Sequence, residues 1–306
     1  MDWNQEIISE NQRLRLPLLE EAGVEVFVKR EDLIHPEVSG NKWRKLRYHM
    51  LEVMQHSEYE GFITKGGAYS NHILATASAC CQSGFKSVAF VRGERIEPLN
   101  ATLKKAEELG MKFLFISRAD YRKSIKDLKS DHKIIGKWMD VPEGGSDDLG
   151  VKGCEEILAK KDKSDFNIVC TALGTGGTAA GLLRSKKSNQ ELWIFPALRG
   201  MDIEKTLRPW IDERQWQKGL VTVQSDYHFG GYAKLNEDLI TFIRDFEKET
   251  GIPLDPVYTA KMMFGLMDLI KKEKITRGKR ILAIHTGGLQ GRAGMEERLG
   301  LDFSLI

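Results

Sequence analysis

A glycine-rich loop between an apolar strand and a helix is the clearest chemical signal in this chain. The segment ALGTGGTAAGLL occupies residues 172–183 and follows the β-rich run NIVCT. Glycines let the backbone approach an anion closely, and the first N–H groups and the dipole of a helix favour negative charge. Thr175 and Thr178 add hydroxyl donors. We therefore expect a phosphate group to be bound by Gly174, Thr175, Gly176, Gly177 and Thr178.

The same loop also fits the dinucleotide fingerprint G-x-G-x-x-A through Gly174, Gly176 and Ala179. That fingerprint needs an acidic residue at the end of the next strand, about 20 residues further on. Here the strand ends in Pro-Ala-Leu at 196–198, and Glu191 precedes it. No lysine follows the glycines as a Walker loop requires. The loop is therefore typical of one phosphate, and a Rossmann-like NAD-binding oxidoreductase remains as the rival from another class.

A lysine near the start of a predicted helix is the second candidate. In SGNKWRKL, residues 39–46, Asn41 is placed as a helix N-cap and Lys42 falls in the first turn. The positive end of the helix dipole opposes the charge of Lys42, which lowers its pKa and frees the amine for Schiff-base chemistry. Arg44 and Lys45 are interpreted as ordinary solvated surface residues.

Two further segments combine glycines with hydrogen-bonding groups. KGGAYSNHILATASACC, residues 65–81, ends a strand and opens an apolar helix at Ser70 and Asn71. HTGGLQG, residues 285–291, follows the strand RILAI. Taken singly, the first is a capped helix and the second an ordinary exit from a strand.

The elements that must position these segments alternate between strands and helices. Helices are expected over 101–109, over 239–249 and around Trp43, Leu46, Met50 and Met54. This alternation predicts an α/β fold with largely parallel sheets. The β-rich runs lie at 24–29, 61–64, 87–91, 112–116, 167–173, 192–198, 221–224 and 280–285.

Composition excludes several classes of partner. The 306 residues include 46 basic and 44 acidic side chains, a net charge of +2, so neither nucleic acid nor an anionic membrane is expected. The four cysteines, at 80, 81, 154 and 170, form no C-x-x-C pair, which indicates a reducing compartment and no metal site. The N-terminus lacks a basic-then-apolar signal pattern. A cytoplasmic protein with a small-molecule substrate is expected.

Together these segments resemble one family, the fold-type II pyridoxal-phosphate enzymes, and within it the 1-aminocyclopropane-1-carboxylate deaminase and D-cysteine desulfhydrase group. The resemblance runs in family order from residue 28 to 288. It implies two three-layer α/β domains of the tryptophan synthase β type: a large domain of residues 1–46 and 146–306, and an inserted small domain of residues 47–145. A cleft between them holds pyridoxal 5′-phosphate, and a homodimer is expected. The matching motifs are VKREDL, SGNKWRKL, GGAYSNH, PEGGSDDLGVKG, GTGGTAAGL, LDPVYTAKMMFGL and IHTGG.

The resemblance also implies a role for individual residues. Lys42 matches the lysine that covalently holds the cofactor, Asn71 the asparagine beside its 3-hydroxyl, and the loop 174–178 its phosphate site. Ser70 and Tyr258 match catalytic residues on the substrate side. The remaining expected site residues are Tyr232 as a second active-site tyrosine, His72 beside the substrate, and Thr259 or Thr286 at the pyridine nitrogen.

Two threonines favour one reaction within the family. Ring-opening deaminases carry a glutamate after DPVY and H-L-G-G near the C-terminus, whereas this chain has Thr259 and Thr286. His72 favours the same choice of reaction as the two threonines. A hydroxyl at the pyridine nitrogen leaves a weaker electron sink than a carboxylate does, which suits elimination of a thiolate. The sequence therefore predicts a lyase that converts D-cysteine to pyruvate, sulfide and ammonia, with ring-opening deamination of the cyclopropane amino acid, or another amino acid, as the alternative.

Overall fold

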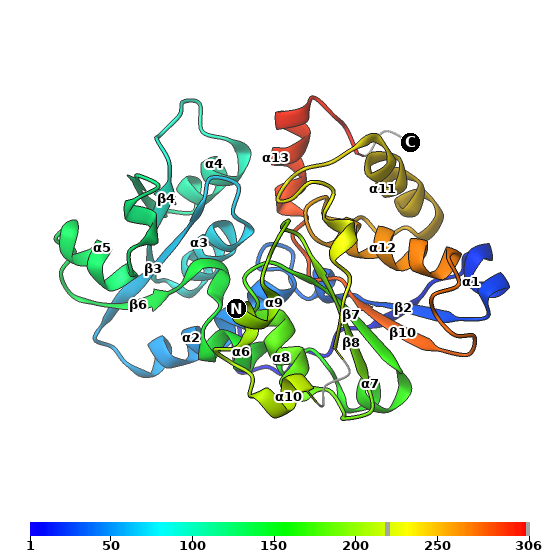
Figure 1. Ribbon diagram of the computed structural model, residues 1–306. Coiled ribbons are helices and arrows are strands. Elements are labelled where there is room, and N and C mark those ends of the chain that lie inside the picture. The colour runs from blue at the N-terminus through cyan, green and yellow to red at the C-terminus, as the bar shows by residue number, and fades with distance from the viewer. Residues whose placement is uncertain (218–220, 304–306) are drawn as a thin grey trace.

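The computed structural model describes residues 1–217 and 221–303. Within them the strands form two sheets, which lie in different halves of the molecule (Figure 1). In the six-stranded sheet the order is β1-β2-β10-β7-β8-β9, and every strand except β1 runs parallel to its neighbour. The four-stranded sheet is fully parallel, with the order β5-β4-β3-β6. The predicted α/β class with mainly parallel sheets is confirmed.

The strands of the large sheet are β1 (Asn11–Arg13), β2 (Glu25–Lys29), β7 (Ile168–Leu173), β8 (Glu191–Pro196), β9 (Val221–Val223) and β10 (Arg280–Ile284), and those of the small sheet are β3 (Tyr59–Gly67), β4 (Lys86–Arg92), β5 (Lys112–Ile116) and β6 (Lys137–Val141). The α-helices are α1 (Pro17–Ala22), α2 (Asn41–Gln55), α3 (Asn71–Ser83), α4 (Ala101–Glu108), α5 (Ile125–Asp131), α6 (Asp148–Cys154), α7 (Lys160–Asp165), α8 (Gly177–Ser185), α9 (Ile203–Leu207), α10 (Glu213–Gln217), α11 (Glu237–Thr250), α12 (Thr259–Lys271) and α13 (Gln290–Leu299). Short 3₁₀ turns are η1 (Glu31–Leu33), η2 (Asp120–Arg122), η3 (Glu143–Gly145) and η4 (Ser225–His228).

Helices cover both faces of the large sheet, so its central strands are apolar along their whole length. Every residue of β7 is buried. Ile168 and Cys170 pack toward α11 and α12, while Val169 and Leu173 pack toward α8 on the opposite face. Such uninterrupted apolar runs are typical of parallel strands between helical layers.

The small sheet is covered by α2, α3 and α4 on one face and by α5 on the other. Helix α2 connects the two sheets. Its Asn41 N–H donates to the Thr286 carbonyl after β10, and its Trp43 and Leu46 join the core against Phe62 of β3. The domain limits at residues 46 and 145 stay a prediction.

Two strands and one cap differ from the sequence expectations. Strands β1 and β6 were not expected because β1 has only polar residues and the KWMDV run of β6 mixes charge with apolar side chains. The N-cap of α2 is Gly40, while the Asn41 side chain bonds to Thr178 instead of capping the helix. Met54, expected on the apolar face of α2, is 51% exposed.

A buried ion pair fixes the start of α2. The Arg44 guanidinium donates from Nε and Nη2 to the two carboxylate oxygens of Glu31, at 2.8 Å each, and both side chains are almost fully buried. The Ser9 hydroxyl donates to the same carboxylate at 2.6 Å. Because Arg44 follows Lys42 by two residues, this pair sets the position of the helix start.

Replacing Glu31 by glutamine is expected to lower the free energy of unfolding by about 3 kcal/mol or more, because the Arg44 guanidinium then stays buried without its counter-charge. Urea denaturation followed by circular dichroism measures the loss.

The matched control is Glu58→Gln. Glu58 pairs with Lys137 on the surface, where both side chains are half exposed, so the free energy of unfolding should stay nearly unchanged. Equal losses in the two variants would contradict a special role for the Glu31–Arg44 pair.

Candidate active site

The expected site segments meet at the carboxyl ends of the parallel strands. The loop 174–178 follows β7, residues 285–288 follow β10, and residues 68–72 follow β3. Ligands of open α/β sheets bind outside this edge. Helix α2 begins between these loops and brings Lys42 to them.

Close backbone packing determines where Lys42 lies. Gly40 has a φ of 62°, and a Cβ at this position would overlap the Thr286 carbonyl oxygen. Only glycine tolerates both conditions. The Lys42 Nζ lies 3.4 Å from the carbonyl oxygen of Gly144, in the segment expected to cross between domains.

The environment of Lys42 is unfavourable to a charged amine. Burial lowers the pKa of Lys42 to about 7, and the nearby Lys45 ammonium adds to the effect. Lys45 itself is buried and donates to the Gly144 carbonyl at 3.0 Å and to the Ser146 hydroxyl at 2.9 Å. The interpretation of Arg44 and Lys45 as surface residues is therefore wrong: Arg44 enters a buried ion pair, and Lys45 is held by the segment 144–146.

The loop 174–178 surrounds the start of α8. Gly176 is the N-cap of this helix. The Thr178 hydroxyl accepts from Asn41 Nδ2 at 2.9 Å, and the Thr175 hydroxyl lies 2.6 Å from that of Ser146. A Cβ at Gly177 would lie 3.2 Å from the Lys45 Nζ. Helix N–H groups, hydroxyls and an ammonium thus gather where the sequence predicts a phosphate site.

Residues 70–72 lie at the start of α3, directly after β3 of the small sheet. The Ser70 hydroxyl caps the helix by accepting from the Ile73 N–H. Asn71 Nδ2 donates to the Gly288 carbonyl at 3.2 Å, while its Oδ1 is buried with no partner among the described residues. His72 is buried, and its Nε2 lies 2.9 Å from the Thr64 hydroxyl. Its predicted contact with substrate stays a prediction.

Tyr258 and Thr259, at the start of α12, are held by hydrogen bonds to Asp255. The Asp255 Oδ1 accepts from the Tyr258 N–H at 2.6 Å, and the Thr259 hydroxyl accepts from the Asp255 N–H at 2.8 Å. The Tyr258 ring packs on the phosphate loop, where a Cβ at Gly174 would lie 3.0 Å from it. Its ring centroid is 6.1 Å from that of Tyr232. The two expected tyrosines therefore lie together beside the loop.

Lys261 is a residue of this region that the sequence reasoning missed. It lies one turn after Tyr258 and is almost fully buried. Its Nζ donates to the carbonyls of His228 at 2.9 Å and Gly231 at 2.7 Å, in the turn that carries Tyr232. Burial lowers its pKa to about 8.

Asp255 was also missed as a functional residue, although its signal was present. An aspartate four residues before a helix start can accept from the first N–H groups of the helix, and DPVYT fits this pattern. No comparable signal marks Lys261, since its partners lie 30 and 33 residues earlier.

The gathered residues fit pyridoxal phosphate. Lys42 offers an amine of lowered pKa, the loop 174–178 offers N–H and hydroxyl donors, and the unpartnered Asn71 Oδ1 is free to accept a hydrogen bond. The Thr259 side chain is buried near Asp255, whereas Thr286 meets the start of α2 through its carbonyl. Which threonine faces a pyridine nitrogen stays a prediction.

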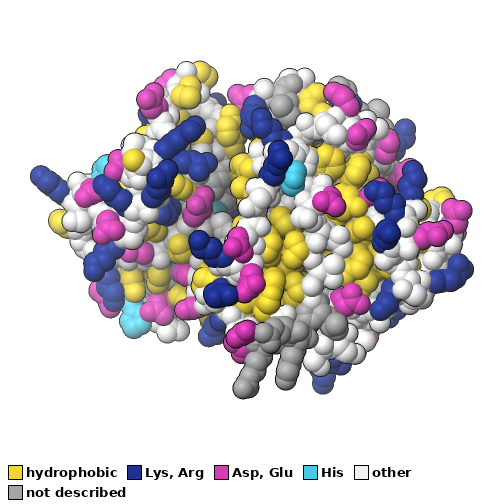
Figure 2. Space-filling view, viewed as in Figure 1, with side chains coloured by type: hydrophobic (Ala, Val, Ile, Leu, Met, Phe, Trp, Pro, Cys, Tyr) yellow, Lys and Arg dark blue, Asp and Glu magenta, His cyan; other side chains and the backbone are white. Residues whose placement is uncertain are grey.

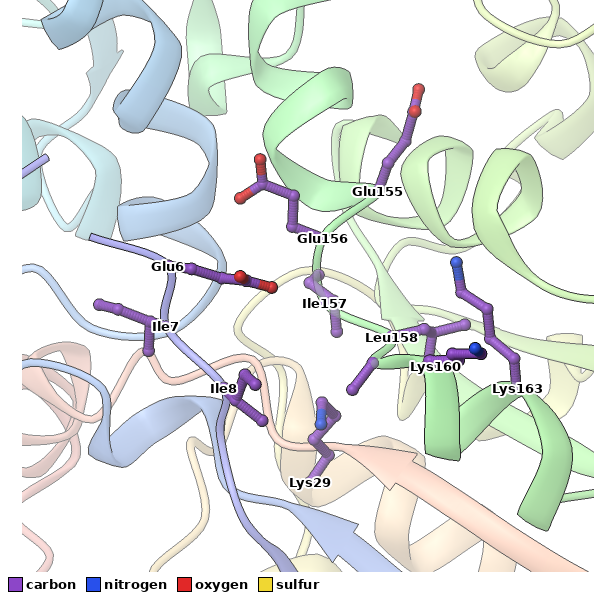
Figure 3. A pocket seen from close by; sticks show the side chains of 11 residues that line it. Glu6, Ile7, Ile8, Lys29, Glu155, Glu156, Ile157, Leu158, Lys160 and Lys163 are labelled. Atoms are coloured by element: carbon purple, nitrogen blue, oxygen red, sulfur yellow. The ribbon is translucent and has the colours of Figure 1, made fainter. Parts of the chain in front are cut away.

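A separate hollow lies between the N-terminal segment 6–8 and the segment 155–163 (Figure 3). It is lined partly by Ile7, Ile8 and Ile157 and by Lys29, whose ammonium is paired with Asp162 at 2.7 Å. None of the expected site residues lines it. In the part of the chain that the structure describes, no helix is long and apolar enough to span a membrane, and no group of three or more His, Cys, Asp or Glu is placed to hold a metal ion.

Replacing Lys261 by methionine is expected to raise the deuterium exchange rate of residues 225–236 by about tenfold or more, because two buried carbonyls lose a charged donor. Hydrogen–deuterium exchange with peptide mass spectrometry measures it. Lys271→Met, which removes an exposed lysine of the same helix whose side chain forms no hydrogen bond or ion pair with the described residues, is the control and should leave the exchange unchanged. Equal exchange in Lys261→Met and the wild type would show that Lys261 does not hold this turn.

Comparison with known proteins agrees with the geometry. The chain is 32% identical to a Pyrococcus abyssi protein provisionally named 1-aminocyclopropane-1-carboxylate deaminase, over 89% of this chain and 86% of the relative. It is 31% identical to the Arabidopsis thaliana mitochondrial bifunctional D-cysteine desulfhydrase/1-aminocyclopropane-1-carboxylate deaminase, over 88% of this chain and 73% of that protein. A crystal structure of an ACC deaminase homologue superposes with a TM-score of 0.79 at 28% identity, covering 96% of this chain and 93% of the other. Residues 7–287 match the sequence profile of the family described as pyridoxal-phosphate dependent enzyme, and the chain belongs to that family.

Proposed function

We propose that the protein catalyses β-elimination and deamination of a small amino acid, with D-cysteine as the substrate that its residues fit best. The observation that carries the proposal is the Lys42 amine, which lies 3.4 Å from the Gly144 carbonyl oxygen at the start of a helix whose Asn41 donates to Thr178, and whose pKa burial lowers to about 7. In the proposed reaction D-cysteine and one water give pyruvate, hydrogen sulfide and ammonia. The Cα–H and Cβ–S bonds break, sulfur leaves with the bonding electrons, and water supplies the ketone oxygen.

Pyridoxal phosphate, when bound, supplies an electron sink for the electrons left at Cα. Lys42 is the residue that we assign to covalent attachment and to proton removal at Cα. At neutral pH a substantial fraction of an amine with a pKa near 7 is uncharged, so it can accept a proton.

The start of α3 fits the carboxylate of the substrate. The N-terminal N–H groups of a helix attract an anion, and Ser70 and Asn71 stand at this end. Carboxylate binding there would orient the Cα–H bond.

The two tyrosines fit proton donation to the leaving group. Burial raises the pKa of Tyr258 well above its ordinary value, and burial also raises the pKa of Tyr232. Both phenols are therefore protonated at neutral pH. Tyr258 is the less exposed member of the pair, so we assign it the proton delivered to sulfur, whereas Tyr232 is 45% exposed.

A neutral residue at position 259 supports elimination over ring opening. The Thr259 hydroxyl is engaged with the Asp255 backbone, and a hydroxyl cannot hold the pyridine nitrogen protonated as a carboxylate does. Ring-opening deamination is the second candidate, because the Arabidopsis relative carries both activities in its name.

We also propose that the enzyme is cytoplasmic and homodimeric, and that its domains, divided at residues 46 and 145, close over the substrate.

The rate at which the apoprotein binds pyridoxal phosphate should rise as pH increases through about 7 and level off by about pH 8. The neutral amine is the reactive form, so the rate follows deprotonation of Lys42. Stopped-flow measurement of the visible absorption band tests this, with Lys42→Ala giving no such band. A rate that continues to rise toward pH 10, as for an ordinary lysine, would contradict the lowered pKa.

The purified holoenzyme should release sulfide and pyruvate in equal amounts from D-cysteine, with a kcat/KM on the order of a hundredfold or more above that for ketobutyrate release from 1-aminocyclopropane-1-carboxylate. Methylene-blue and lactate-dehydrogenase assays measure the sulfide and the pyruvate.

L-Cysteine tests the stereochemistry, and Lys42→Ala gives the background rate. Ketobutyrate release without sulfide release would replace the first candidate by the second.

A further inference from the structure

Three arginines line one depression at the carboxyl edge of the small sheet. Arg92 ends β4, Arg118 follows β5, and Arg122 belongs to η2 together with Tyr121. We call the depression lined by Arg92, Arg118, Tyr121 and Arg122 the arginine pocket. Figure 2 shows Lys and Arg side chains gathered on this half of the molecule, beside the hollow between the halves.

The guanidinium groups of the arginine pocket are not paired with a carboxylate in the part of the chain that the structure describes. Among the described residues, the side chains of Arg92, Arg118 and Arg122 form no ion pair and no hydrogen bond, and the Arg92 guanidinium carbon lies 5.2 Å from the centroid of the Tyr121 ring. Arg95, in the same half of the molecule, pairs instead with Glu97 and Glu107. Like charges that share a depression repel one another. Because no carboxylate pairs with these guanidinium groups, binding of an anion would relieve their repulsion.

Tyr121 forms the floor of the arginine pocket. It is 8% exposed, and the Lys65 Nζ lies 5.2 Å from its ring centroid, a cation–π contact of the same kind as that of Arg92. Lys65 donates to the backbone carbonyls of Tyr121 and Lys123, at 3.1 and 2.9 Å. The pocket is thus built on a fixed aromatic ring with a further positive charge beside it.

The arginine pocket lies next to the site for the substrate carboxylate. A Cβ at Gly67 would lie 3.6 Å from the Arg92 Nη2, and the Gly67 carbonyl accepts from the Ser70 N–H at 3.0 Å. Burial raises the pKa of Tyr232, and the charge of Arg92 acts in the opposite direction, which places Arg92 within electrostatic reach of the tyrosine pair. Glu143 faces Tyr121 and Tyr232 from the segment over Lys42 and partly offsets the positive charge.

We propose that the arginine pocket binds a carboxylate carried on the β-substituent of the amino-acid substrate, so that the enzyme prefers substrates with an acidic leaving group. This inference rests on the proposed elimination and deepens it. A guanidinium presents two parallel N–H donors to a carboxylate, and charge-assisted bonds of this kind are the strong ones. Arg92 is the specificity-determining residue because its guanidinium lies beside Gly67, whose carbonyl accepts from the Ser70 N–H.

A pair of substrates that differ only in charge tests the preference. S-Carboxymethylcysteine and its amide, S-carbamoylmethylcysteine, have nearly the same size. Each would give pyruvate, ammonia and a thiol: the Cα–H and Cβ–S bonds break, the thiolate leaves with the electron pair, and one water supplies the oxygen of pyruvate. Both enantiomers of each compound are assayed with the holoenzyme through pyruvate release.

The readout is the ratio of kcat/KM for the acid to that for the amide, compared between variants, because this comparison cancels the different reactivity of the two thiols. Arg92→Ala should lower the ratio by about tenfold or more, the effect of about one charge-assisted contact. Arg92→Lys should restore part of it. The control Arg95→Ala removes an arginine of the same half that lies outside the arginine pocket and should leave the ratio unchanged.

Calorimetric binding of both compounds gives a second ratio that needs no turnover. If neither compound releases pyruvate, the proposed elimination fails, and the binding ratio still decides the charge preference. A ratio that is the same in the wild type and in Arg92→Ala overturns the inference. If inorganic sulfate binds to the wild type and not to Arg92→Ala while the ratio is unchanged, the pocket takes a free anion, which also overturns it.

Discussion

The contact between the Gly40 backbone and the Thr286 carbonyl is the constraint on which the site depends. It joins the start of α2 to the loop after β10, so that Lys42 has one position relative to the large sheet. The same helix then packs Trp43 and Leu46 against the small sheet. Helix α2 therefore carries the reactive amine and links the two sheets. Any movement of one sheet relative to the other would change the position of Lys42.

The charge state of Lys42 depends on the lack of a carboxylate partner for its amine among the described residues. Lys29, which is almost fully buried, is paired with the Asp162 carboxylate at 2.7 Å. Lys42, Lys45 and Lys261 point instead at backbone carbonyls, at 2.7 to 3.4 Å. A carbonyl dipole compensates burial less than a full negative charge does, so the pKa of each of these amines is lowered. The site thus uses uncompensated burial to obtain reactive nitrogen at neutral pH.

Local pattern was sufficient to predict much of the fold and the main site segments. The apolar runs predicted β7 and β10 correctly, because a strand that is buried on both faces is a continuous apolar run that can be recognised without knowing its neighbours in the fold. The glycine loop and Lys42 were found because a helix start is a local signal. Burial of Arg44 and Lys45 could not be read this way, since their partners Glu31, Gly144 and Ser146 are brought near only by the folded chain.

The two sides of the site differ in how they present positive charge. On the large-sheet side, the start of α8 offers backbone N–H groups and the Lys45 ammonium, whose hydrogen bonds to residues 144–146 fix it in place. On the small-sheet side, Arg92, Arg118 and Arg122 have no such bonds within the described residues and keep their donors free. A fixed ammonium suits an anion that stays bound through many turnovers, as a cofactor phosphate does. Free guanidinium groups suit an anion that arrives and leaves with each substrate, because no internal bond has to break when it binds.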